Sequence, residues 1–224
     1  MSNLGLFVIT AGIPLLFGLW AQMKVKRTFA KYSQVAPRNG MTGAEAAAAV
    51  LRASGLPNLS IRPVAGRLSD HYDPRNRTLN LSADVGQASS LAALGVAAHE
   101  AGHAIQDAKR YAPMRIRQTL VPAATIGQSL WFLPVILGIV LNITGLVTVG
   151  LVLFAAIVLF QLVTLPVEFD ASKRALVALE GHGLLAADEL PGARKVLNAA
   201  ALTYVAGFVA ALGQLIYFFA LSRE

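Results

Sequence analysis

The chain has 224 residues and a mass of 23.6 kDa, and 55% of its residues are hydrophobic whereas only 14% are charged. With a mean hydropathy of +0.58 and no cysteine, this composition excludes a disordered chain, an ordinary soluble domain and any thiol chemistry, and it favours a membrane protein. The net charge of +7 is assigned to loops on one side of a membrane, and nucleic-acid binding is not expected.

Four uncharged stretches predict four membrane-spanning helices. Residues 1–23 carry no charged side chain and basic residues follow at once, which is the reverse of a cleaved signal peptide. Residues 118–167 contain no ionisable group and are divided midway by turn-type residues, so two spans are expected, at about 120–141 and 146–167. A fourth span with a short tail is expected in 196–224. This pattern predicts a multi-pass protein in a lipid bilayer.

The basic residues are concentrated in the two polar segments that lie between the predicted spans. Segment 24–117 holds 14 of the 19 Lys and Arg, and segment 168–195 holds 4. Because basic loops are retained on the cytoplasmic side, both segments are predicted to be cytoplasmic and both termini to face outward.

The larger polar segment is predicted to be a small α+β module. A helix is expected at about 43–53, after a threonine cap, and a β-like segment at 59–64. Two further runs, 67–72 and 78–82, flank a turn sequence and predict a hairpin. A second helix is expected at about 89–109. The fold class expected is therefore a mainly α membrane protein that carries this module.

The second helix of the module contains a His-Glu-x-x-His motif. His99 and His103 are displaced by only ~40° around a helix of 3.6 residues per turn, so both imidazoles can bind one metal ion from one face. Glu100 lies next to that face, where it can take a proton from zinc-activated water as a general base. The motif predicts Zn²⁺ as the cofactor and identifies segment 24–117 as a metallopeptidase module.

A third protein ligand is needed, because two histidines leave a hydrolytic zinc site incomplete. Glu168 is favoured, since it is the first ionisable group after 50 neutral residues and an unpaired carboxylate would be costly at that apolar boundary. Segment 168–195 is accordingly expected to supply the third ligand. His182 has either a surface role or a role in binding metal or the transition state. The candidates considered are Glu168, Asp170, Glu180, His182, Asp84 and Asp107.

The motifs resemble a known family. Residues 99–106, 165–172 and 199–206, together with 70–74, look like the bacterial membrane neutral zinc metallopeptidase family, and the likeness covers nearly the whole chain. The chain is similar, more distantly, to the heat-shock and CAAX-prenyl membrane metalloproteases. The resemblance implies a zinc-dependent protease in a bacterial inner (plasma) membrane.

The distant relatives also imply a ligand set. In them a Glu that follows the spans is the third ligand and an Asp four residues later supports the site. On that pattern Glu168 corresponds to the ligand, whereas the position four residues later is Ser172 and the nearby acid is Asp170. The resemblance therefore leaves the supporting residue open.

The function expected is that of a membrane-embedded zinc endopeptidase that cleaves peptide or membrane-protein substrates. Glu100 is the expected general base, and His182 and Tyr204 are the candidates to stabilise the developing oxyanion. An edge strand of the hairpin is expected to pair with an extended substrate. A homo-oligomer is compatible with these features.

Two alternatives are open. A non-catalytic membrane scaffold with structural zinc is disfavoured because a purely structural site has no use for Glu100. A site-2-type intramembrane protease carries the motif inside a spanning helix, but the uninterrupted apolar run before His99 is too short for a span.

Overall fold

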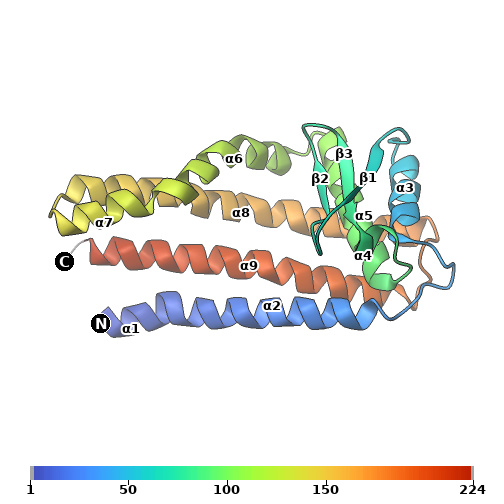
Figure 1. Ribbon diagram of the computed structural model, residues 1–224, viewed down its shortest axis with the longest axis horizontal. Helices are drawn as coiled ribbons and strands as arrows, with labels where there is room; N and C mark the ends of the chain where they lie inside the picture. Colours follow the sequence, from blue (N-terminus) through green and yellow to red (C-terminus); the bar gives the residue numbers. More distant parts are fainter. Residues whose placement is uncertain (1–2, 223–224) are drawn as a thin grey trace. The chain divides into compact units, whose positions relative to one another are not determined.

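The computed structural model describes residues 3–222, and this part of the chain is mainly helical with one small sheet (Figure 1). As the sequence predicts, four helical stretches are long and apolar enough to cross a membrane. These stretches are Leu4–Tyr32, Ala112–Val140, Thr144–Gly181 and Leu190–Leu221.

The first two stretches are interrupted helices and the last two are continuous. The first combines α1 (Asn3–Phe7), a π-helical turn η1 (Val8–Gly12) and α2 (Ile13–Tyr32). The second combines α6 (Ala112–Leu130) and α7 (Phe132–Val140). The third and fourth are α8 (Thr144–Gly181) and α9 (Leu190–Leu221).

Helix α8 does not end where its uncharged stretch ends, at Val167, but continues to Gly181. Residues 168–181 contain no proline and no glycine before Gly181, so helix propagation continues through the charged residues. The helix stops at Gly181 and Gly183, and Gly183 has a φ of +62°.

The described residues form two compact units. The first, here called the helical unit, contains residues up to Gln22, Ala112–Pro166 and the chain from Leu202 onward. The second, here called the sheet unit, contains Met23–Tyr111 and Val167–Ala201.

Aromatic packing and an apolar exterior characterise the helical unit. Trp131 lies between Phe154 and Phe218, with ring centroids 4.7 Å and 5.4 Å away. In the most apolar window of each of the four candidate spans, only 17–28% of the residues are buried. Because so many apolar side chains face outward, the candidate spans have the surface expected of helices in contact with lipid.

The sheet of the second unit has three strands in the order β1-β3-β2. Strand β1 (Ser60–Val64) pairs in parallel with β3 (Thr78–Ser82), and β2 (His71–Asp73) pairs antiparallel with β3. The predicted hairpin is confirmed, but its first strand begins at His71 rather than at residue 67. Gly66 and Leu68 have φ of +98° and +54°, and these left-handed conformations interrupt an extended strand.

Three helices complete this unit beside the sheet: α3 (Gly43–Ala53), the short α4 (Ala83–Gly86) and α5 (Leu91–Ala108). The predicted threonine cap is present, since the Thr42 hydroxyl accepts from the Glu45 backbone and the Glu45 carboxylate accepts in return from the Thr42 backbone. Helix α5 is capped by Ser90, whose Oγ accepts a hydrogen bond from the Ala93 backbone. Helices α3 and α5 both contain buried alanines, so they pack closely against each other. This packing holds α5 in place.

Candidate metal centre

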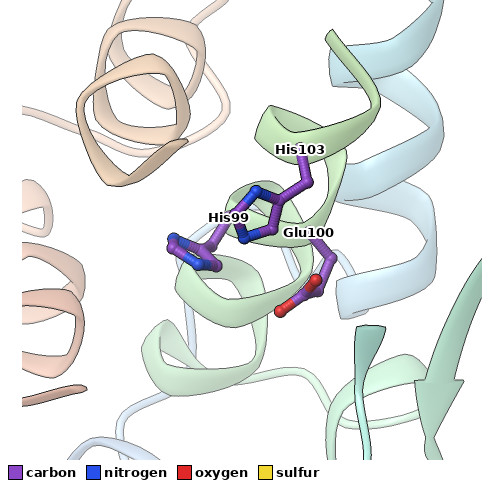
Figure 2. Close-up of side chains that lie close together, drawn as sticks. All are labelled: His99, Glu100 and His103. Atoms are coloured by element: carbon purple, nitrogen blue, oxygen red, sulfur yellow. The ribbon is translucent and has the colours of Figure 1, made fainter. Parts of the chain in front are cut away.

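Helix α5 presents three polar side chains close together (Figure 2). His99 and His103 lie one helical turn apart on one face, and their ring centroids are 4.7 Å apart with the rings nearly perpendicular. Glu100 lies beside them, and metal-binding atoms of the three residues are all within 4.8 Å of one another. The spacing of the motif therefore produces the cluster of donor atoms that it predicts.

A second carboxylate reaches the same imidazoles from α8. Oε2 of Glu168 lies 3.2 Å from Nε2 of His99 and 3.5 Å from Nε2 of His103. The Glu168 side chain is only 3% exposed, so it is a buried carboxylate directed at two imidazoles. In a tetrahedral zinc site with bonds of about 2.0–2.1 Å, neighbouring donor atoms are about 3.3–3.4 Å apart. The donor set and its spacing fit zinc.

The two carboxylates at the cluster have different surroundings. Oε2 of Glu100 accepts a hydrogen bond of 3.1 Å from the Tyr72 backbone N–H, on strand β2. Burial raises the pKa of the Glu100 carboxyl above its ordinary value. Glu168 instead lies against the two Nε2 atoms themselves. This difference favours Glu168 as the third ligand and leaves Glu100 beside the donors, next to the sheet.

Gln106 fixes the tautomer of His103, that is, which of its two ring nitrogens carries the proton. Nε2 of Gln106 donates to the Val167 backbone carbonyl and to the Asp170 carboxylate, both at 2.8 Å. Because the amide N–H groups are used there, the amide oxygen must face His103, whose Nδ1 lies 3.0 Å away. Nδ1 therefore carries the proton, and Nε2 is left free to bind a metal ion.

Ser172 and Asp170 divide the supporting role that the sequence leaves open. The Ser172 hydroxyl lies 3.1 Å from Nδ1 of His99, so the residue four positions after Glu168 does contact a motif histidine. Asp170 instead accepts from Gln106 and pairs with Arg174 at 2.5 Å. Both residues orient imidazoles, one directly and the other through Gln106.

The other candidates for the third ligand have different surroundings. Asp84 pairs with Arg67 at 2.9 Å, and Asp107 accepts from the Tyr72 hydroxyl at 2.9 Å. Glu180 and His182 are exposed, at the end of α8 and in the turn that follows it. Tyr204 lies on α9 in the helical unit, whereas the histidines belong to the sheet unit. The oxyanion roles predicted for His182 and Tyr204 stay predictions.

Sequence reasoning did not identify Gln106 or Tyr72 as part of the site. Gln106 lies three residues after His103 and so on the same face of the helix, which is a signal that the spacing rule offers. Tyr72 has no such signal, because its contact with Glu100 depends on how the sheet packs against α5.

Gly102, inside the motif, allows α5 to approach α8. A Cβ at this position would lie 2.7 Å from the Ala171 carbonyl oxygen and 3.2 Å from the Ala171 Cα. Since Ala171 is one turn from Glu168 on α8, the approach of the two helices at Gly102 brings the Glu168 carboxylate to the imidazoles.

We expect Gly102→Ala to weaken zinc binding by about 10–100-fold, because the backbone contact forces α8 away and misplaces the Glu168 carboxylate. Competition with a chromophoric chelator measures this affinity in the purified protein. Gly181→Ala is the matched control, since a Cβ there meets nothing within 4 Å. Equal affinity of Gly102→Ala and wild type would show that the helix approach does not position Glu168.

Together these features define a class: a helical protein with four membrane-length apolar helices and a zincin-type donor set on a helix beside a small sheet. A family model described as "Putative neutral zinc metallopeptidase" matches residues 7–223, and the chain belongs to that family. A relative from Bacillus subtilis (strain 168), named "Putative membrane protease YugP", is 42% identical over 213 residues, which are 95% of this chain and 94% of the relative. No solved structure matches the chain.

Proposed function

We propose that this chain is a zinc-dependent membrane endopeptidase in which His99, His103 and Glu168 hold the metal ion. The observation that carries the proposal is the Glu168 carboxylate, which lies 3.2 Å and 3.5 Å from the two Nε2 atoms although it comes from a different helix. The family match and the name of the Bacillus relative support the reaction class.

In the proposed reaction, zinc would supply Lewis-acid polarisation of the scissile carbonyl and of a water molecule. Glu100 accepts the proton of the attacking water and then donates it to the leaving amine nitrogen. Gln106 and Ser172 keep the imidazoles oriented through their Nδ1 atoms. His182 and Tyr204 are the residues we propose to test as donors to the oxyanion.

The substrate is proposed to bind as an extended strand. In the order β1-β3-β2, strand β2 is an edge, so within residues 3–222 no strand lies beside its outer backbone groups. The same strand contacts Glu100 through Tyr72. Pairing at this edge would recognise the peptide backbone of a peptide or membrane-protein substrate and would give broad specificity.

The two alternatives make different demands on the chain. A scaffold with structural zinc has no need of a carboxylate beside the donor set, where Glu100 lies. A site-2-type protease carries its motif on a spanning helix, but α5 is not among the four candidate spans of residues 3–222. Both observations favour a peptidase whose motif helix lies outside the apolar spans.

The physiological substrate is best sought in cells. Comparing new protein termini in the membrane proteomes of cells that express wild type or Glu100→Gln would identify cleavage sites that depend on the general base. No difference between the two proteomes, at equal expression, would count against the proposed protease activity.

We expect the module at 24–117 and the segment 168–195 to face the cytoplasm, because they hold 18 of the 19 Lys and Arg. The chain has no cysteine, so single cysteines introduced at exposed positions report accessibility without background. A cysteine at Arg52, on α3, should react with an impermeant maleimide only after the membrane is opened. Labelling of this position in intact cells would reverse the orientation.

A further inference from the structure

Strand β2 is short, and its register with β3 leaves one residue whose backbone N–H and C=O point away from β3. Tyr72 pairs with Leu79, while His71 and Asp73 pair with Asn80 and Thr78. Residues of an antiparallel pair alternate between exchanging hydrogen bonds with the partner and pointing away from it. The Tyr72 N–H donates to Glu100, so it points away from β3. The Tyr72 N–H and C=O are therefore the groups that a further strand would use.

One of those two groups is already engaged. The Tyr72 N–H donates to Oε2 of Glu100, at 3.1 Å. Because an N–H has one proton, a carbonyl oxygen of an incoming peptide strand and the Glu100 carboxylate compete for it. The edge of the sheet and the proposed general base are thus linked by a single donor.

A second contact keeps this donor in place. Tyr72 is only 8% exposed, and its hydroxyl donates to Asp107 on α5 at 2.9 Å. Asp107 lies seven residues after Glu100, two turns along the same helix face. Burial and the nearby Asp107 raise the pKa of Tyr72 to about 12, so the hydroxyl stays protonated and keeps donating. Tyr72 therefore fastens β2 to α5 at two points.

We infer that Tyr72 couples substrate binding to release of the general base: a peptide strand that pairs with β2 takes the Tyr72 N–H and frees the Glu100 carboxylate. Without a peptide, Glu100 is held on the edge strand. With a peptide, the carboxylate is available to the attacking water. This inference rests on the proposed function, and it assigns Tyr72 as a positioning residue that acts through Glu100.

Two inactive variants test the exchange without interference from cleavage. Glu100→Gln keeps an amide oxygen that can accept from the Tyr72 N–H, whereas Glu100→Ala removes the acceptor. Both are neutral at this position and both keep the proposed zinc ligands, so zinc-loaded full-length proteins differ in the acceptor and in side-chain length, and Glu100→Met controls for the length. The probes are amide hydrogen exchange at Tyr72 and the binding of fluorescein-labelled insulin B chain.

We expect the Tyr72 amide to exchange faster in Glu100→Ala than in Glu100→Gln, while the amides of His71 and Asp73, which face β3, are unchanged. Insulin B chain should bind Glu100→Ala about fivefold more tightly, since one neutral hydrogen bond no longer competes, and should restore protection at Tyr72. Glu100→Met, which keeps the length of the side chain without a strong acceptor, should behave as Glu100→Ala. Unchanged exchange at the buried residues of helix α3, such as Val50 and Leu51, verifies that the variants are folded.

Equal exchange at Tyr72 in the alanine and glutamine variants would overturn the inference, as would measurable binding of the peptide to both variants with equal affinity. Binding of the peptide to neither variant would instead contradict the proposed edge-strand substrate, which is part of the proposed function. The exchange rates distinguish these cases because they are measured with and without peptide.

Discussion

Glu100→Gln is expected to keep zinc and to lose cleavage, with kcat/KM lower by about 10²–10⁴-fold, because the amide cannot accept the proton of the attacking water. Glu100 lies beside the histidines and is held by the Tyr72 N–H, whereas Glu168 lies against both Nε2 atoms. The substitution should therefore remove the base without removing a ligand. Zinc content by mass spectrometry, measured together with peptide cleavage, checks both halves of this expectation.

The matched control is Glu180→Gln, which makes the same chemical change at an exposed position near the end of α8. It should leave both zinc content and cleavage at the wild-type level. If Glu100→Gln cleaved at a rate near that of wild type, Glu100 would not be the base. If it lost zinc, Glu100 would be a ligand, and the roles of the two carboxylates would be exchanged.

Glu168→Ala should lower zinc affinity by more than about 100-fold, because it removes a ligand and leaves only the two imidazoles from the protein. A bound metal stabilises the folded state by about 2.7 kcal/mol when its free concentration is about 100 times its Kd. The variant should therefore lose the zinc-dependent increase in Tm that wild type shows. Chelator competition and thermal unfolding with and without zinc measure the two effects.

Asp170→Ala is the comparison variant, since Asp170 acts through Gln106 and carries an ion pair with Arg174. Its zinc affinity should fall by about 10–100-fold at most, which is typical of a residue that orients a ligand. A larger loss of affinity in Asp170→Ala or His182→Ala than in Glu168→Ala would contradict the ligand assignment.

Local patterns in the sequence were sufficient for much of the secondary structure. The uncharged stretches predict four long apolar helices, and the predicted threonine cap is present at Thr42. The spacing of His99 and His103 places both imidazoles on one face of a helix. These features follow from helix geometry and from the cost of placing charge in an apolar stretch, which depend on neighbouring residues alone.

The tertiary structure decided what depends on contacts between distant segments. Strand β1 pairs in parallel with β3, a partner that the alternation of one segment cannot reveal. Glu168 is 69 residues from His99, and although the apolar boundary favours it as a ligand, only the packed helices show that it contacts an imidazole while Asp170 contacts Gln106. This difference in contacts follows from the close approach of α5 and α8 at Gly102 and from the orientation of the Gln106 amide. Both are packing and hydrogen-bond constraints that exist only when the helices are in contact.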